Sequence, residues 1–353
     1  MTRIGRIGLI GLFFLSPIAH AQAAPRWSLA IHGGAGVIER DSLTPEQDAA
    51  YRAALQAALD AGSAVLDGGG SALDAVQAAI QVMEDDPLFN AGRGAVFTAE
   101  GRNELDAAVM NGPDLTAGAV AGLTTTRHPI AAARAVMEQS PHVMLIGAGA
   151  DAFAAQSGLE QVDPAWFFTQ RRWDQLIRAL TQQALPTPVP PAGAPGSPIG
   201  GLASAEPAPP LNERKFGTVG AVALDSQGRL AAGTSTGGMT AKRWGRVGDV
   251  PVIGAGTYAS NADGCAVSAT GSGEYFIRST VARDICRRTA EGASVQAAAQ
   301  GEIDEVGSIG GDGGVIVMGL DGTPAFAMNT SGMYRGGVSS TSPARVAIYA
   351  DER

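Results

Sequence analysis

The residue with the strongest case for chemistry is a threonine that follows a low-complexity segment. Residues 184–210 are dominated by Pro, Ala, Gly and Ser, and the chain returns to an apolar, β-prone run at Thr218, directly after Gly217. A threonine at a chain terminus can use its own α-amine as the base that activates its hydroxyl. That amine has an unperturbed pKa of about 8. Thr218 could act in this way only if the chain were cut after Gly217.

Glycine before the threonine would permit such a cut. Because Gly217 has no side chain, its backbone can take up the strained conformation that an N-to-O acyl shift requires. On spacing alone, however, the Gly217–Thr218 step is most simply a linker followed by an ordinary strand.

Histidine and metal chemistry have little support in the sequence. Four histidines are present, and His32, His128 and His142 are scattered along the chain after the N-terminal segment. The sequence has no His-Glu-x-x-His or Cys-x-x-Cys metal motif and no Gly-x-x-x-x-Gly-Lys-Ser/Thr phosphate loop. We interpret His32, the best placed of the three, as a structural residue rather than a catalytic base.

Composition and charge narrow the class of protein. The chain has 353 residues, 45% hydrophobic and 17% charged, which is typical of one large or two small globular domains. The net charge of -9 leaves no basic surplus to neutralise phosphates. We therefore expect no nucleic-acid partner.

The N-terminus, residues 1–23, is typical of a secretory signal peptide. Two arginines precede a short apolar run at 7–18, and small-x-small cleavage sites follow it. This run is too short for a comfortable membrane span, so we expect a periplasmic or secreted protein with no membrane contact after signal removal. That compartment would allow Cys265 and Cys286 to pair, although two buried free thiols are the simpler interpretation.

The remaining pattern predicts a layered α+β fold, because strands in consecutive hairpins are mixed with helices. The expected helices lie at residues 44–59, 71–83, 129–138, 166–180 and 273–288, and the first two begin at cap residues, Thr44 and Ser71. The expected strands lie at residues 27–31, 95–97, 107–110, 143–146, 218–224, 230–235 and 263–270, with two more flanking Asp321–Gly322. Residues 32–36 are expected to form a glycine turn, and residues 84–94 a loop.

Seven sequence blocks resemble those of the plant-type L-asparaginases, also called isoaspartyl peptidases. They occur in the family's order at residues 32–36, 90–94, 215–225, 234–238, 245–249, 269–274 and 310–314. The resemblance covers essentially the whole chain after the N-terminal segment except the linker. A signal peptide and a proline-rich linker are the two departures from the family pattern.

The resemblance implies a fold, a processing event and an activity. The fold would be a four-layer αββα sandwich of the N-terminal-nucleophile hydrolase type. A self-catalysed cut would give an α chain of residues 24–217, ending in a flexible linker at 184–214, and a β chain of residues 218–353. Two such pairs would form an (αβ)₂ dimer that hydrolyses L-asparagine and β-aspartyl dipeptides without a catalytic cofactor.

The resemblance also implies roles for individual residues. Thr218 would attack the side-chain amide carbonyl, and Thr236 would orient its hydroxyl and amine. Arg246 and Asp249 would hold the substrate's α-carboxylate and α-ammonium groups. The oxyanion donors would be Thr270 and Gly271, and further substrate contacts would come from Val247, Gly248, Ser272, Gly273 and Asn90. A structural sodium ion would be held by the backbone carbonyl groups of Met83, Glu84, Asp86, Phe89, Ala91 and Arg93.

Two other functions remain open from the sequence. A glycosylasparaginase shares this fold, nucleophile and clamp but accepts a sugar on the amide nitrogen; Phe216 before the junction fits the asparaginase branch better. A periplasmic amino-acid-binding protein would suit the signal peptide and the Arg/Asp clamp. A binding protein would not need Gly217–Thr218 after a linker.

Overall fold

The computed structural model describes Met1, residues 26–194 and residues 217–352. Apart from Met1, the expected signal peptide lies outside the described residues, as does the expected linker from residue 195 onward. The strands are β1 (Ser28–Gly36), β2 (Leu105–Asn111), β3 (Ala117–Leu123), β4 (Met144–Ile146), β5 (Val219–Leu224), β6 (Leu230–Thr236), β7 (Thr257–Ser260), β8 (Cys265–Gly271), β9 (Gly313–Gly319), β10 (Pro324–Met328), β11 (Gly332–Ser339) and β12 (Ser342–Tyr349).

Helices account for most of the remaining regular structure. The α-helices are α1 (Pro45–Asp67), α2 (Ala72–Asp85), α3 (Pro129–Gln139), α4 (Gly147–Gln156), α5 (Gln170–Gln182), α6 (Gly273–Ser279), α7 (Val281–Ala290) and α8 (Val295–Ser308). Short 3-10 helices are η1 (Arg40–Ser42), η2 (Gly92–Gly94) and η3 (Pro164–Phe167). Among the described residues, no helix is both long and apolar enough to cross a membrane.

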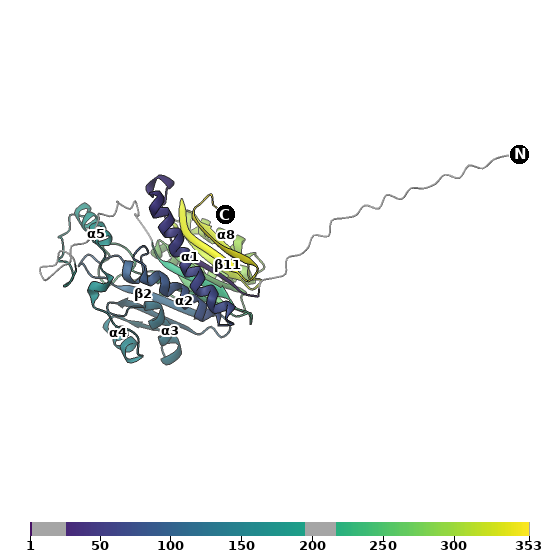
Figure 1. Cartoon of the computed structure of the whole chain (residues 1–353), viewed down its shortest axis with the longest axis horizontal. Helices are drawn as coiled ribbons and strands as arrows, with labels where there is room; N and C mark the ends of the chain where they lie inside the picture. The colour runs from purple at the N-terminus through teal and green to yellow at the C-terminus, as the bar shows by residue number, and fades with distance from the viewer. Residues whose placement is uncertain (2–25, 195–216, 353) are drawn as a thin grey trace.

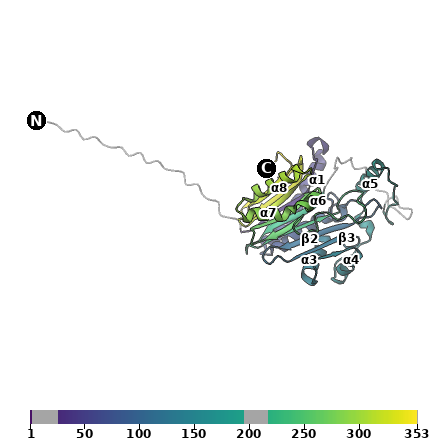
Figure 2. The ribbon, with the colours of Figure 1, turned by 180° about the vertical axis from the view of Figure 1, so that it is seen from behind.

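Two sheets organise the described part of the chain. The larger has the strand order β12-β11-β1-β5-β6-β2-β3-β4 and the smaller the order β10-β9-β8-β7. Adjacent strands run antiparallel except β3 and β4, as the α+β expectation requires. Helices α1, α2 and α3 pack on one face of the larger sheet, whose other face contacts the smaller sheet (Figure 1). Helices α7 and α8 pack against the smaller sheet, as the view from behind shows (Figure 2).

Two predicted helix starts are confirmed by their caps. Thr44 and Gln47 form a reciprocal capping box at the start of α1, and Ser71 and Asp74 form one at the start of α2. Helix α1 extends to Asp67 rather than Leu59 because its alanine- and leucine-rich face continues to pack on β1 and β11.

The glycine-rich block at 32–36 is strand rather than turn, so that prediction was wrong. Strand β1 continues to Gly36 with every residue buried, and its pairing with β11 shifts by one residue between His32 and Gly34. A methyl group at Gly33 would lie 2.4 Å from Phe89 Cε1. The glycine therefore allows close packing rather than a reversal of the chain.

Two other local predictions were also wrong. Residues 95–97 form no regular strand; only an isolated bridge joins Phe97 to Asn103. The expected helix at 273–288 is divided at Thr280, whose φ of 51° lies in the left-handed region. At the start of the expected linker, Leu185 packs against the cluster that contains Trp173.

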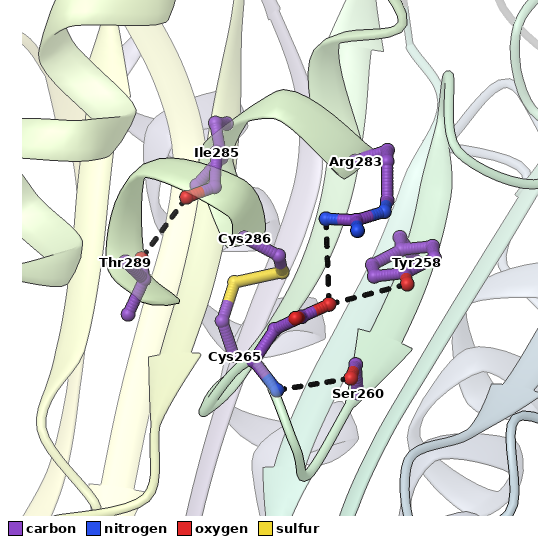
Figure 3. Close-up of a disulfide and its surroundings, with 8 residues drawn as sticks. Tyr258, Ser260, Cys265, Arg283, Ile285, Cys286 and Thr289 are labelled. Atoms are coloured by element: carbon purple, nitrogen blue, oxygen red, sulfur yellow. Dashed lines mark hydrogen bonds and ion pairs between the residues drawn. A yellow bond between two sulfur atoms is a disulfide. The ribbon is translucent and has the colours of Figure 1, made fainter. Parts of the chain in front are cut away.

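The two cysteines are bonded, which corrects the interpretation as free thiols. Cys265 begins β8 and Cys286 lies on α7, with their Cα atoms 5.3 Å apart. Tyr258 and Arg283 lie beside the disulfide (Figure 3). Asp263 accepts a hydrogen bond from the Tyr258 hydroxyl and pairs with Arg283 of α7 at 3.4 Å. The disulfide and the ion pair both fasten α7 to the smaller sheet.

Candidate active site

Thr218 and Thr236 lie side by side where β5 and β6 meet. Strand β5 begins directly after Thr218, and Val219 pairs with Ser235, the residue before Thr236. The two threonine Oγ1 atoms are 2.9 Å apart, and both side chains are buried. The sequence predicted this pair, and the hairpin of β5 and β6 is what brings it together.

A third group contacts the threonine pair. The backbone N–H of Gly238 donates to Thr236 Oγ1 at 3.0 Å. Thr236 keeps one acceptor lone pair and its own hydrogen, so either threonine hydroxyl can donate to the other. When Thr236 is the donor, it stabilises negative charge that develops on the Thr218 oxygen.

Asn90 connects the segment before Thr218 to the segment after Thr236. Its backbone N–H donates to the carbonyl oxygen of Gly217 at 2.9 Å, and its own carbonyl accepts from Gly237 at 2.9 Å. Its side chain donates to the Gly238 carbonyl at 2.8 Å and accepts from Val96 at 2.9 Å. Asn90 is thus fully engaged beside the Gly217–Thr218 peptide bond.

Thr270 lies at the same end of the two sheets. The register of β1 against β5 pairs His32 with Gly220, so the later residues of β1 run toward Thr218. Ala35 of β1 donates its N–H to Thr270 Oγ1 at 3.3 Å, which leaves the threonine hydrogen free to donate. This is the same arrangement that Gly238 makes with Thr236.

The residues after Thr270 are fixed by close backbone packing. A methyl group at Gly271 would lie 2.5 Å from Phe276 Cε2 and 2.6 Å from the Asp312 carbonyl oxygen. Ser272 donates its N–H to that carbonyl at 2.8 Å and its hydroxyl to the Asp312 carboxylate. Glycine is required here because a side chain would collide with its surroundings.

The predicted clamp residues lie next to this segment. A methyl group at Gly273 would be 2.7 Å from Asp249 Oδ1 and 2.9 Å from Arg246 Nη2, and one at Gly248 would be 2.7 Å from Arg246 Nη1. Val247, between them, is partly exposed. The structure therefore brings both clamp side chains against the residues that follow Thr270.

Arg246 has a partner that the sequence did not predict. Its Nε and Nη2 donate to the two carboxylate oxygens of Glu274 at 2.9 and 3.0 Å. This contact lowers the pKa of Glu274 below its ordinary value. One edge of the guanidinium is held in place, and Nη1 and the second hydrogen of Nη2 lie on its other edge.

Asp249 is a buried carboxyl with an unsatisfied oxygen. Burial is the main reason that its pKa is raised to about 7, and the nearby Glu274 and Asp106 raise it further while Arg246 lowers it. Its Oδ2 has no hydrogen-bond partner within the described residues. A cation bound there would gain a partner and would restore the charged form.

His32 is neutral and structural, in agreement with the sequence interpretation. It is fully buried, and burial lowers its pKa to about 3. Nδ1 is 3.1 Å from the Thr218 carbonyl oxygen, and Nε2 is 2.9 Å from Ser268 Oγ. A carbonyl can only accept, so the imidazole hydrogen is on Nδ1.

The loop predicted to hold sodium surrounds the η2 turn. A methyl group at Gly92 would be 2.2 Å from the Glu84 carbonyl oxygen, and one at Gly94 would be 2.0 and 2.7 Å from the carbonyl oxygens of Phe89 and Pro87. The other predicted ligands lie on α2 or the same loop: Met83, Asp86, Ala91 and Arg93. The carbonyl oxygens of Phe89 and Pro87 thus both lie close to Gly94, and backbone carbonyl oxygens are ligands that a hard cation accepts.

The Glu84 side chain forms hydrogen bonds outside this loop. Its Oε1 accepts from Ser235 Oγ at 2.6 Å and from the Ile130 N–H at 3.0 Å. Burial raises the pKa of Glu84 to about 8. Residues 233–237 also spell Gly-x-Ser-x-Gly, but Ser235 lies within β6 rather than on a strand-to-helix turn, so it is no serine-hydrolase nucleophile.

Asp106 is a site residue that the sequence reasoning missed. It lies on β2 directly opposite Thr236, and its Oδ2, like that of Asp249, has no partner among the described residues. Burial raises its pKa, and the positive charges of Lys242 and Arg246 lower it. An acidic residue inside an otherwise apolar strand was the signal that could have identified it.

The chain is similar to known asparaginases and isoaspartyl peptidases over most of its length. The family model described as asparaginase matches residues 25–348. The isoaspartyl peptidase of Escherichia coli strain K12 is 47% identical over 310 residues, which cover 87% of this chain and 91% of that protein. The isoaspartyl peptidase of Salmonella typhimurium is 45% identical, covering 87% and 93%. The plant-type L-asparaginase of Pyrococcus abyssi is 39% identical, covering 87% and 94%.

Proposed function

The chain belongs to the asparaginase family and is an amidohydrolase, and from this premise we propose that Thr218 is its nucleophile after self-cleavage at Gly217. The substrates are L-asparagine and β-aspartyl dipeptides. The observation that carries the proposal is the arrangement at one peptide bond: the Gly217 carbonyl accepts from Asn90, and Thr218 Oγ1 lies 2.9 Å from Thr236 Oγ1.

Self-cleavage is the first step. Thr218 Oγ1 attacks the carbonyl carbon of Gly217, and the Asn90 N–H lies where negative charge develops on the carbonyl oxygen. The C–N bond breaks as the nitrogen gains a proton, which leaves an ester between Gly217 and the Thr218 oxygen. Water hydrolyses the ester to a Gly217 carboxylate and a free threonine with its own α-amine.

Turnover uses the same oxygen on an external amide. The α-amine of Thr218 accepts the hydroxyl proton as Oγ1 attacks the side-chain carbonyl of the substrate. Thr270 and Gly271 supply hydrogen bonds to the oxyanion, each worth about 3 kcal/mol in comparable sites. Ammonia or an amino acid leaves with the proton, and water then hydrolyses the acyl-enzyme to aspartate.

The clamp selects substrates with a free amino-acid end. Arg246 takes the α-carboxylate through its outer edge, and Asp249 takes the α-ammonium. Gly248 and Gly273 keep the space around both side chains free of methyl groups, and Val247 and Ser272 line the same segments.

Four further features belong to the proposal. The fold is a four-layer αββα sandwich, which is supported by the helices that pack on the outer faces of the two facing sheets. Two processed chains form an (αβ)₂ dimer, which is supported by the exposed apolar residues Val143, Met144 and Ile146 along the edge strand β4. The loop at residues 83–93 holds a structural sodium ion through its backbone carbonyl groups, as the family resemblance implies. Export is supported by the signal-like residues 1–23 and by the disulfide.

Intact mass and N-terminal sequencing of the purified protein test the nucleophile. The proposal predicts two fragments, with the second beginning at Thr218, and a single chain for Thr218→Ala. If Thr218→Ala still splits after Gly217, or if active enzyme is one unbroken chain, the mechanism is wrong. An amino-acid-binding protein would also remain a single chain and would release no product.

The substrate is tested by measuring aspartate released from asparagine, β-aspartyl-leucine and glycosylated asparagine. We expect turnover of the first two. Preferred turnover of the glycosylated compound would identify a glycosylasparaginase instead.

A further inference from the structure

A row of buried hydroxyl groups continues from His32 into the space between the two sheets. Ser268 Oγ, 2.9 Å from His32 Nε2, is also 2.7 Å from Thr234 Oγ1. Thr234 Oγ1 is in turn 2.7 Å from Thr257 Oγ1. All four side chains are fully buried and come from strands β1, β8, β6 and β7.

The hydrogens in this row can be assigned by counting. The Thr218 carbonyl fixes the imidazole hydrogen on Nδ1, so Nε2 must accept, and only Ser268 can supply that bond. Ser268 has then used its hydrogen, so Thr234 donates to it at 2.7 Å, a shorter contact than the 3.3 Å from Thr234 Oγ1 to the Gly256 carbonyl oxygen. Thr257 donates to Thr234, and its single hydrogen is shared with the Val250 carbonyl oxygen at 3.1 Å. The bonds from Thr234 through Ser268 and His32 therefore all point toward Thr218.

The surrounding backbone is shaped to admit the row. A methyl group at Gly220, two residues after Thr218, would be 1.9 Å from Ser268 Oγ and 2.4 Å from His32 Nε2. Any other residue at that position would displace the contact between the two sheets. Hydrogen bonds aligned in one direction in a dry interior also polarise one another and strengthen the last donor of the row.

We propose that His32, Ser268, Thr234 and Thr257 form a one-way hydrogen-bond relay that positions the nucleophile through the carbonyl group of Thr218. They are positioning residues, because none touches the Thr218 hydroxyl. The inference rests on the proposed nucleophile. Once the chain is cut, Thr218 has no covalent neighbour on its amino side, and its carbonyl and hydroxyl contacts hold its orientation.

From its position, the relay should affect kcat rather than KM. The last acceptor of the relay is the nucleophile residue, whereas Arg246 and Asp249 bind the substrate through other side chains. A small misplacement of a reacting atom is known to slow catalysis by as much as about 100-fold. Loss of a link should therefore slow both self-cleavage and turnover and leave ground-state binding intact.

A graded set of variants tests the relay in the full-length, self-processed enzyme. We expect Ser268→Ala to lower kcat about tenfold, with KM unchanged within about twofold. Thr234→Val should have a smaller effect and Thr257→Val the smallest, because each lies one link further from Thr218. Thr234→Ser, which restores the hydroxyl, should recover most of the activity.

Ser28→Ala is the matched control. Ser28 is also fully buried, on β1, but its Oγ has no partner within the described residues. The control should process and turn over like wild type. If Ser268→Ala matches it, or if the relay variants raise KM at unchanged kcat, the relay is wrong. If wild type itself remains uncut and active, the proposed nucleophile fails instead, and melting curves identify any variant that is merely unfolded.

Discussion

The candidate site has a nucleophile end, around Thr218 and Thr236, and a clamp end, around Arg246 and Asp249. Neutral hydrogen-bonded groups form the first, and charged groups form the second. At the nucleophile end, Thr218, Thr236 and His32 are neutral and their hydrogen bonds are satisfied. At the clamp end, the charged or titratable side chains of Arg246, Asp249 and Glu274 lie close together, and Asp249 Oδ2 has no partner within the described residues.

This difference indicates which part of the site is complete without substrate. A buried polar atom without a partner costs about 1–3 kcal/mol, so such atoms are rare unless something binds them. The nucleophile end is already organised, whereas in the proposed mechanism the clamp end gains its missing partner when an α-ammonium group arrives. Catalysis and binding should therefore respond separately to substitution.

The largest effect should come from the nucleophile end. Thr236→Val removes the hydroxyl 2.9 Å from Thr218 Oγ1 while keeping the shape of the side chain. Loss of one transition-state donor typically costs about 100- to 1,000-fold in kcat, and we expect a loss in this range with little change in KM. Steady-state kinetics measures it, and Thr236→Ser should restore activity; a change confined to KM would contradict the comparison.

A region remote from both ends should affect stability without affecting either. Cys265 and Cys286 are 21 residues apart, and a loop of that length contributes about 3 kcal/mol in the chain-entropy model. We expect the Cys265→Ala, Cys286→Ala double variant to lose stability of about that size in urea unfolding. Its kcat and KM should stay near wild type at 25 °C, and a large change in KM would show that α7 is coupled to the clamp.

The clamp should respond in KM. Arg246→Lys keeps the charge but loses the paired hydrogens that a guanidinium offers to a carboxylate. A hydrogen bond to a charged group contributes about 1.5–3 kcal/mol, so kcat/KM should fall about tenfold to 100-fold, mainly through KM. Activity on succinamic acid, which lacks the α-ammonium group, provides the matched test of Asp249→Asn: that variant should lose activity on asparagine but not on this analogue.

The sequence predicted the elements that depend on local chemistry. The caps at Thr44 and Ser71 and the hairpin of β5 and β6 follow from short-range rules, and the structure confirms them. The clamp and nucleophile motifs came from family resemblance rather than from spacing, because Gly217–Thr218 alone is an ordinary dipeptide.

The features that the sequence missed depend on contacts between distant segments. Ser268 meets His32 across 236 residues, and Arg246 meets Glu274 across 28. The strand conformation at 32–36 depends on pairing with β11 and on packing against Phe89. No local pattern encodes these partners, and the pairing of Cys265 with Cys286 likewise required the spatial separation of their Cα atoms.

The pH dependence should distinguish the two ends. The pKa of Asp249 is raised to about 7 in the free enzyme, so below that pH the carboxyl is protonated and cannot accept an α-ammonium charge. In the proposed mechanism, the Thr218 α-amine must also lose a proton to act as a base. We therefore expect kcat/KM to fall more steeply below pH 7 than kcat does, because kcat reports the substrate complex, in which Asp249 is already paired. If kcat and kcat/KM fell equally steeply on the acid side of their pH profiles, this expectation would be contradicted.

The smallest expected effect is a shift in the acid limb of the kcat/KM profile when one neighbour of Asp249 is changed. Glu274 raises the pKa of Asp249 through its negative charge, so Glu274→Gln should move the acid limb of kcat/KM to lower pH by less than about one unit. The limb of kcat should not move, because the Thr218 amine controls it. The substitution also weakens the paired hydrogen bonds that Glu274 accepts from Arg246. Loss of those bonds would change KM at every pH, whereas the electrostatic effect changes only the midpoint of the acid limb of kcat/KM. A pH profile that moves in kcat and kcat/KM together would show that the two ends are not independent.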